Sequence, residues 1–177
     1  MNVELNSRIR SQWDKTDWGG IVQDMCGIPI PFDNNWKSIA VDMSGGADSA
    51  LLVYLLANYI MQLHARNKYV STRIHIISHI RMWRTRPWQK YYRERALAEI
   101  QSRFPRIKFI IHENFIPPEI EMGSIGTIIP VGDTLKSGDQ IESGMFARYI
   151  CTTHKIDAKY GSTTANPKVL HGSGGAP

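Results

Sequence analysis

Cysteines and long apolar runs are both scarce in this chain of 177 residues. Two cysteines, Cys26 and Cys151, are too few for a disulfide framework or a cysteine-based zinc cluster, which predicts reduced thiols and a cytoplasmic protein. The longest apolar stretch, 50–60, is too short and too interrupted to span a bilayer. Charged side chains within 1–15 argue against a secretory signal. We therefore expect no membrane partner.

The composition is that of a globular domain. An apolar content of 42% and a charged content of 21% are ordinary, and the length allows a sizeable core. The formal net charge of +5 suits polyphosphate ligands and would equally suit nucleic acid. We expect a single domain over 1–177, with an N-terminal extension at 1–37, a core at 38–167 and a flexible tail at 168–177.

Hydrophobic periodicity predicts an alternation of strands and helices after residue 37. The expected strands are 38–43, 73–80, 107–112 and 157–161. The expected helices begin near Ala50, at a Thr85 cap, and at Ser137 or Asp139, the second of them ending at Pro105. Residues 1–37 are expected to form a short helix and a packed loop, and 113–138 a long irregular segment. This alternation predicts an α/β fold, a parallel twisted sheet with helices on both faces.

Each expected helix has an apolar stripe that should face the sheet. In the first the stripe is Leu51, Leu52, Leu55, Leu56, Tyr59, Ile60 and Leu63; in the second Trp88, Tyr91, Tyr92, Ala96 and Ile100; in the third Ile141, Met145, Tyr149 and Ile150.

The segment Ser44–Ser49, S-G-G-A-D-S, follows the first strand and opens the first helix. Free N–H groups and the helix dipole make such a turn an anion site, and its two glycines let a phosphate approach the main chain. Asp48 is the only carboxylate in the turn, so a triphosphate there implies an intervening Mg²⁺. The alternative role of Asp48 is to stabilise the helix through the dipole.

This pattern resembles the PP-loop of the N-type ATP pyrophosphatases, and the resemblance covers roughly 38–167. It implies an adenine nucleotide α-hydrolase-like, Rossmann-like layout and cleavage of ATP to AMP and pyrophosphate. The nucleotide-binding residues it implies are Ser44, Gly45, Gly46, Ala47, Asp48 and Ser49 in the turn, main-chain groups at His79, Ile80 and Arg81, and Gly161 and Ser162 after the fourth strand. The implied metal ligand is Asp48. The candidate catalytic residues are Asp48, Ser49 and Arg84. Arg81, Arg84 and Arg86 all precede the second helix at the active-site end, and one of the three is expected to stabilise the leaving pyrophosphate.

Three further groups have competing interpretations. Asp42, just before the turn, is a weaker candidate because acids at strand ends are often solvated. His75 and His79 share one strand face and are interpreted as structural. Six cations crowd 81–95 among four aromatic residues. They could bind nucleic acid, or they could be the solvated face of a helix whose aromatic face is buried.

The resulting hypothesis is an adenylating enzyme that activates a carboxylate or carbonyl oxygen for attack by ammonia or another nucleophile. Its size and large insert resemble 7-cyano-7-deazaguanine synthase-like proteins, although their four-cysteine zinc site is missing. A tRNA-modifying PP-loop enzyme and a non-catalytic ATP- or AMP-binding module are the alternatives. Assembly into a homo-oligomer is left open.

Overall fold

The computed structural model describes residues 20–23, 29–66, 72–81, 88–118, 120, 128–131, 134–161 and 170–172. A five-stranded sheet with the strand order β5-β4-β3-β8-β9 forms its centre. The strands are β3 (Ser38–Asp42), β4 (Arg73–Arg81), β5 (Phe109–Ile116), β8 (Ala158–Tyr160) and β9 (Leu170–Gly172). The first four run parallel, and β9 pairs antiparallel with β8. The predicted α/β fold built on a parallel sheet is confirmed.

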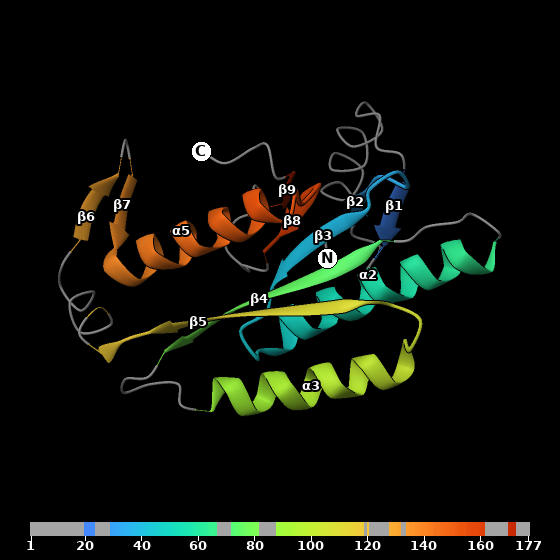
Figure 1. Cartoon of the computed structure of the whole chain (residues 1–177), viewed down its shortest axis with the longest axis horizontal. Coiled ribbons are helices and arrows are strands. Elements are labelled where there is room, and N and C mark those ends of the chain that lie inside the picture. The colour runs from blue at the N-terminus through green and yellow to red at the C-terminus, as the bar shows by residue number, and fades with distance from the viewer. Residues whose placement is uncertain are drawn as a thin grey trace, which may run out of the picture.

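Helices cover both faces of this sheet. Figure 1 shows α2 (Ala47–Ala65) and α3 (Gln89–Arg103) on one side and α5 (Gly138–Thr153) on the other. The alternation of β3 explains this, since Ile39 and Val41 pack with residues of α2 and α3, whereas Ala40 packs with residues of α5. Both faces of the central strand are therefore buried, as expected of a parallel sheet.

The first helix, α2, begins at Ala47, three residues earlier than predicted. Its buried face includes Val53 and Ala57, whereas Leu51 is 44% exposed, so the predicted stripe is wrong at Leu51. At 3.6 residues per turn, Leu51 lies on the side of α2 opposite the buried Leu56 and Ile60. No helix in the described part of the chain is long and apolar enough to cross a bilayer.

The second helix, α3, buries a different face from the one predicted. Its buried residues are Arg93, Leu97 and Ile100, with Ala96 partly buried. Trp88, Tyr91 and Tyr92 are more than half exposed, so the prediction of an inner aromatic face is wrong for them. A carboxylate on β5 balances the charge of Arg93, which lets an arginine occupy the buried stripe in place of the aromatic rings. The predicted cap, Thr85, lies outside the described residues, and the helix begins at Gln89 after Trp88.

The segment 113–138 is more regular than predicted. β5 continues to Ile116, four residues into the segment, because β4 pairs with it along its whole length. A two-stranded hairpin, β6 (Ile128–Val131) and β7 (Thr134–Ser137), then leads into α5. In α5, Ala147 is buried, whereas Met145 and Tyr149 are exposed, so the predicted inner face is wrong at Met145 and Tyr149.

Both end segments contribute strands. Within 1–37, β1 (Gly20–Gln23) and β2 (Pro29–Phe32) pair antiparallel where a loop was predicted, and Ile30 and Phe32 enter the core beside α2. The predicted short helix would fall in 1–19, outside the described residues. In the predicted tail, residues 170–172 form β9, which pairs with β8.

Candidate functional site

The loop between β3 and α2 lies at the carboxyl end of the sheet. The backbone N–H of Met43 still donates to the carbonyl of Ile77 over 2.8 Å, so the chain leaves β4 only after this residue. Gly45 then takes a positive φ of 91°, and Gly46 is the N-cap of α2. Two glycines therefore turn the chain from the buried strand straight into the helix.

The N-terminus of α2 is open to an anion. The first amides of a helix have no partner within it, and the N-cap Gly46 supplies no side-chain acceptor. The Ser49 hydroxyl is buried and donates to the Gly46 carbonyl over 3.0 Å, which leaves the exposed Ser44 as the outward hydroxyl. The helix dipole adds positive potential at this point. Asp48 is exposed in the first turn of α2, where a cation could reach its carboxylate.

Gly45 is also where α3 packs against the loop. A Cβ atom at this position would lie 2.5 Å from the carbonyl oxygen of Gln89 and 3.2 Å from the backbone nitrogen of Arg93. At Gly46, by contrast, the nearest atom to such a Cβ is the Ser44 hydroxyl oxygen, 3.6 Å away. The conformation of the loop is therefore coupled to the first turns of α3.

The loop stands at the switch point of the sheet. From β3 the chain moves outward to β4 and β5, then returns through α5 to place β8 on the opposite side of β3. In open α/β sheets, the carboxyl ends of the two strands at such a point border the ligand crevice. Gly161 directly follows β8, so it comes to the same edge as Ser44–Ser49.

An ion pair bridges the two strands at this edge. The ammonium group of Lys159, in β8, donates to the carboxylate of Asp42 at the end of β3. Both side chains are about 30% exposed, at 27% and 32%. Asp42 was a weaker sequence candidate, and Lys159 was missed. A lysine in the middle of a short, otherwise buried strand was the available signal.

The end of β4 extends past its neighbour β3 at the same edge of the sheet. Ile77 is the last residue of β4 that pairs with β3. β4 runs four residues beyond it, and β5 pairs with β4 as far as Arg81. The Ile77 carbonyl faces β3, and backbone groups alternate between neighbouring strands, so the N–H and C=O of His79 face the same way, past the end of β3. Ile80 is buried and Arg81 half-buried. Arg84 and Ser162 lie outside the described residues.

On the α5 side of the sheet, the ionisable groups His79 and Cys151 are held in their neutral forms. The His79 ring meets Phe146 edge-on at 5.9 Å, and burial lowers the pKa of His79, so its imidazole is neutral at pH 7. Burial raises the pKa of the Cys151 thiol, so this cysteine is no activated nucleophile. The other cysteine, Cys26, lies outside the described residues.

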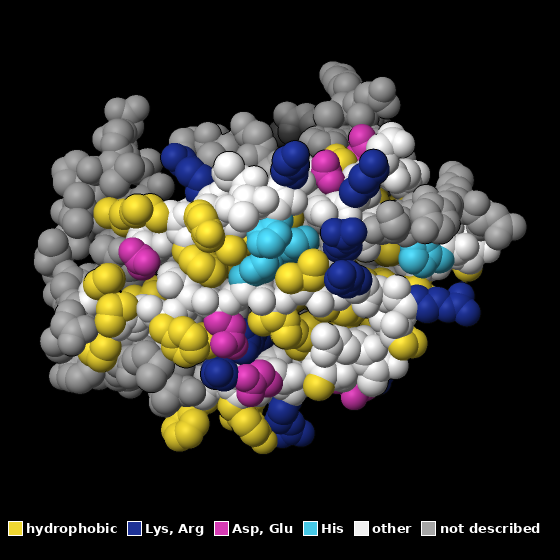
Figure 2. Space-filling view, in the orientation of Figure 1, with side chains coloured by type: hydrophobic (Ala, Val, Ile, Leu, Met, Phe, Trp, Pro, Cys, Tyr) yellow, Lys and Arg dark blue, Asp and Glu magenta, His cyan; other side chains and the backbone are white. Residues whose placement is uncertain are grey.

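Three histidines gather on the α5 face of the sheet, two of them on β4 and β5 and the third just after α5. In Figure 2 a patch of histidine side chains is visible near the middle of the view. Nδ1 of His75 and Nε2 of His112 are 2.9 Å apart, and the His154 ring lies within 5.1 Å of both rings. Burial and the neighbouring histidines lower the pKa of His75 to about 4. Within the ranges that the structure covers, no group of three or more His, Cys, Asp or Glu side chains is arranged to hold a metal ion.

The comparisons with known proteins find similarity in structure but none in sequence family. No protein-family model and no curated protein matches the chain. Among solved structures, NAD+ synthetase from Burkholderia pseudomallei is similar with a TM-score of 0.44 and 15% identity over 72% of this chain and 45% of that one. The U34-tRNA thiolase NcsA from Methanococcus maripaludis, with its [4Fe-4S] cluster, has a TM-score of 0.45 and 16% identity over 89% of this chain and 44% of that one. The chain spans less than half of either structure, and neither likeness transfers an activity to it.

Proposed function

We propose that this chain is an ATP-dependent adenylating enzyme of the PP-loop type, which cleaves ATP to AMP and pyrophosphate. One observation carries the proposal: the sequence S-G-G-A-D-S forms an uncapped helix N-terminus at the switch point of a parallel sheet. Such a site combines free amides, a favourable dipole and space for a phosphate. The main chain of His79, beyond the end of β3, supports adenine binding in the same crevice.

The chemistry asks the protein mainly to position groups and stabilise charge. The acceptor oxygen attacks the α-phosphorus, a new O–P bond forms, and the bond to the bridging oxygen breaks as pyrophosphate leaves with the electron pair. The loop amides and the Ser44 hydroxyl would hold the pyrophosphate oxygens. The exposed Asp48 carboxylate suits Mg²⁺, which usually takes one or two carboxylates plus substrate phosphates and neutralises their charge. Ser49 would hold the loop in shape through its bond to the Gly46 carbonyl, and Arg84 would stabilise the leaving pyrophosphate.

For the second half-reaction we propose that ammonia or another nucleophile displaces AMP from the activated carboxylate or carbonyl, forming a C–N bond. Burial raises the pKa of the Cys151 thiol, which argues against this cysteine as the nucleophile and so supports ammonia or another external nucleophile. We further propose that the acceptor resembles that of 7-cyano-7-deazaguanine synthase-like proteins, because the size of this chain and its large insert resemble theirs. The crevice between Asp42 and Gly161 is where that acceptor would lie.

A tRNA-modifying enzyme is the second candidate, and the exposed face of α3 favours it. Trp88 is 67% exposed, Tyr91 54% and Tyr92 56%. Lys90 lies 5.5 Å from the centre of the Phe115 ring on β5, and Arg95 lies 5.6 Å from the centre of the Tyr91 ring. Exposed aromatic rings beside cations suit the stacking of unpaired bases. The first turns of this helix pack on Gly45, so the surface continues from the mouth of the proposed nucleotide site.

The experiment that tests the first proposal is incubation with ATP, Mg²⁺ and a panel of carboxylate and carbonyl acceptors with ammonia. We expect AMP and pyrophosphate; release of ADP and phosphate instead would contradict the PP-loop assignment. Asp48→Asn should abolish pyrophosphate release, and Glu99→Gln, an exposed change on α3, should leave it unchanged. Nucleotide binding without turnover for every acceptor would favour the non-catalytic module.

For the RNA candidate, affinity for tRNA should fall steeply with salt concentration if phosphate contacts dominate. Tyr92→Ala should weaken the affinity about fivefold or more, because stacking contributes roughly 1–3 kcal/mol per base. Tyr149→Ala, an equally exposed tyrosine on α5, is the matched control. Equal loss in both variants, or no loss in either, would remove the candidate.

A further inference from the structure

Arg93 is the bulkiest fully buried side chain in the described part of the protein, with 2% of its side chain exposed. A buried guanidinium is costly unless it is paired. Its Nη2 donates to Glu113 on β5, and Glu94 on the same helix lies 3.5 Å away. Its Nε and Nη1 are buried and have no partner among the described residues. An arginine at this position therefore carries a desolvation cost that an apolar side chain of similar size would avoid.

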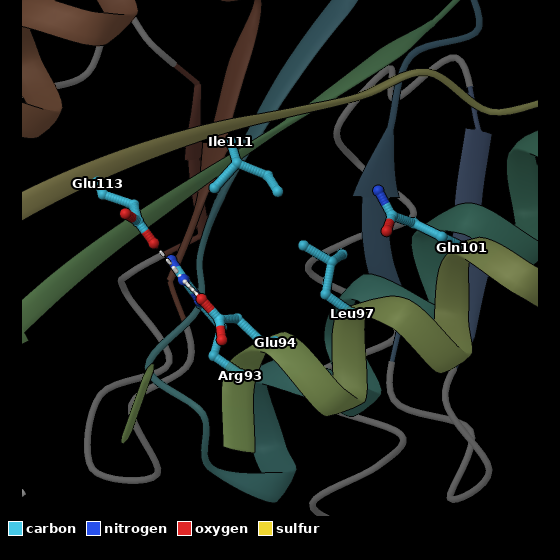
Figure 3. Close-up of a pocket in the computed structure, with 6 residues that line it drawn as sticks. All are labelled: Arg93, Glu94, Leu97, Gln101, Ile111 and Glu113. Carbon is cyan, nitrogen blue, oxygen red and sulfur yellow. Dashed lines mark hydrogen bonds and ion pairs between the residues drawn. The ribbon is translucent and has the colours of Figure 1, made fainter. Parts of the chain in front are cut away.

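Glu113 is the acceptor for two cations from the first two turns of α3. The hydrogen bond from Arg93 lowers the pKa of Glu113, so this carboxylate stays charged. The ammonium group of Lys90 lies 3.6 Å from its second oxygen. Figure 3 shows Arg93 reaching from α3 to Glu113 at one end of a cavity of about 540 Å³. Leu97 and Ile111 face each other across its middle.

These ion pairs lie beside the loop contact. The backbone nitrogen of Arg93 and the carbonyl of Gln89 are the atoms that a Cβ at Gly45 would meet, so they lie close beside this glycine. If the amino-terminal part of α3 moved away from β5, this support would go, and Gly45 would be free to leave its left-handed conformation. The first amides of α2 follow Gly45 directly, so their direction depends on the same contact.

We propose that Arg93 and Glu113 are positioning residues for the nucleotide loop. Their buried ion pair seats α3 on Gly45 and thereby holds the loop in the conformation that presents the amides of α2 to a phosphate. What the loop binds rests on the proposed function, but the coupling between the ion pair and the loop does not. When the competent conformation is only partly populated, apparent affinity falls by that fraction while the bound complex reacts normally. The pair therefore acts on KM for ATP more than on kcat.

The test compares Glu113→Gln with Glu94→Gln, a matched change at a carboxylate that also approaches Arg93 but is 54% exposed and lies on α3 itself. Amide hydrogen exchange within 43–50 is measured at the hydrogen-bonded amides of Met43 and Ala50, in the full-length protein without nucleotide, and KM and kcat for ATP are measured by pyrophosphate release. We expect Glu113→Gln to speed exchange of 43–50 and to raise KM, each by about tenfold, since hydrogen bonds to charged groups contribute roughly 1.5–3 kcal/mol. Glu94→Gln should change both by less than about twofold. Arg93→Lys should recover part of what Arg93→Met loses.

Unchanged exchange of 43–50 in Glu113→Gln would overturn the proposal, because the pair would then only join helix to sheet. A fall in kcat with unchanged KM would overturn it as well. If the wild-type protein releases no pyrophosphate, the proposed function fails, and the exchange comparison still decides the coupling. Should Arg93→Met fail to fold, the nearly isosteric Glu113→Gln still decides it.

Discussion

Replacing Gly45 with alanine tests the loop geometry without any ligand. The backbone of Gly45 is left-handed, with a φ of 91°, and a side chain in that region costs roughly 1–2 kcal/mol. The added Cβ would also lie 2.5 Å from the backbone carbonyl of Gln89, so α3 must shift, and such overpacking costs roughly 1–3 kcal/mol. We expect Gly45→Ala to lower the free energy of unfolding by about 2–5 kcal/mol.

The matched control is the neighbouring glycine. Gly46 has an ordinary φ of −78°, and an added Cβ would meet nothing closer than the Ser44 hydroxyl at 3.6 Å. Gly46→Ala should therefore change the free energy of unfolding by less than about 1 kcal/mol. Urea denaturation followed by circular dichroism measures both variants. Equal stabilities would refute the coupling between the loop and α3, since the two substitutions differ only in backbone angle and in what the new methyl group meets.

Three further outcomes are expected. Because the pKa of His75 is lowered from 6.5 to about 4, the unfolded chain binds more protons, so stability should fall by up to roughly 3 kcal/mol as pH drops from 6.5 to 4. In His75→Gln the free energy of unfolding, measured by denaturation, should depend much less on pH over this range. An unchanged pH dependence would show that other groups cause it. Lys159→Met should cost about 1–3 kcal/mol by leaving Asp42 unpaired, and adding Asp42→Asn should restore part of it; additive losses would exclude the ion pair. In α2, Leu56→Ala should cost about 2–5 kcal/mol and Leu51→Ala under about 0.5, and similar thermal shifts would contradict the assigned face.

Local patterns predict the parts of this fold that local interactions decide. The strand at 38–43 and the loop at 44–49 carry their own signals: an apolar run, two glycines and a polar helix start. The order of β3, α2, β4, α3, β5, α5 and β8 follows from the same alternation. The sequence therefore predicts a candidate site at the carboxyl end of β3.

What the sequence could not predict depends on residues far apart in the chain. Trp88 and Tyr92 look like the inner face of α3 until Glu113, on β5, is known to neutralise Arg93. The Lys159–Asp42 pair joins positions 117 residues apart, and neither residue signals the other. The extension of β4 past β3 likewise reflects the different lengths of β3 and β5, which only pairing reveals.

The position of β8 has a consequence for the order in which the chain folds during synthesis. β3 lies between β4 and β8, and the Asp157 carboxylate accepts from the backbone N–H of Ser38, 119 residues earlier. On the ribosome, β3, β4 and β5 can pair well before β8 emerges, which leaves one side of β3 bare beside the newly made loop. Contacts this distant in sequence form slowly and expose strand edges meanwhile. A nascent chain halted before residue 158 should therefore need protection from aggregation, and its release should coincide with closure of the sheet.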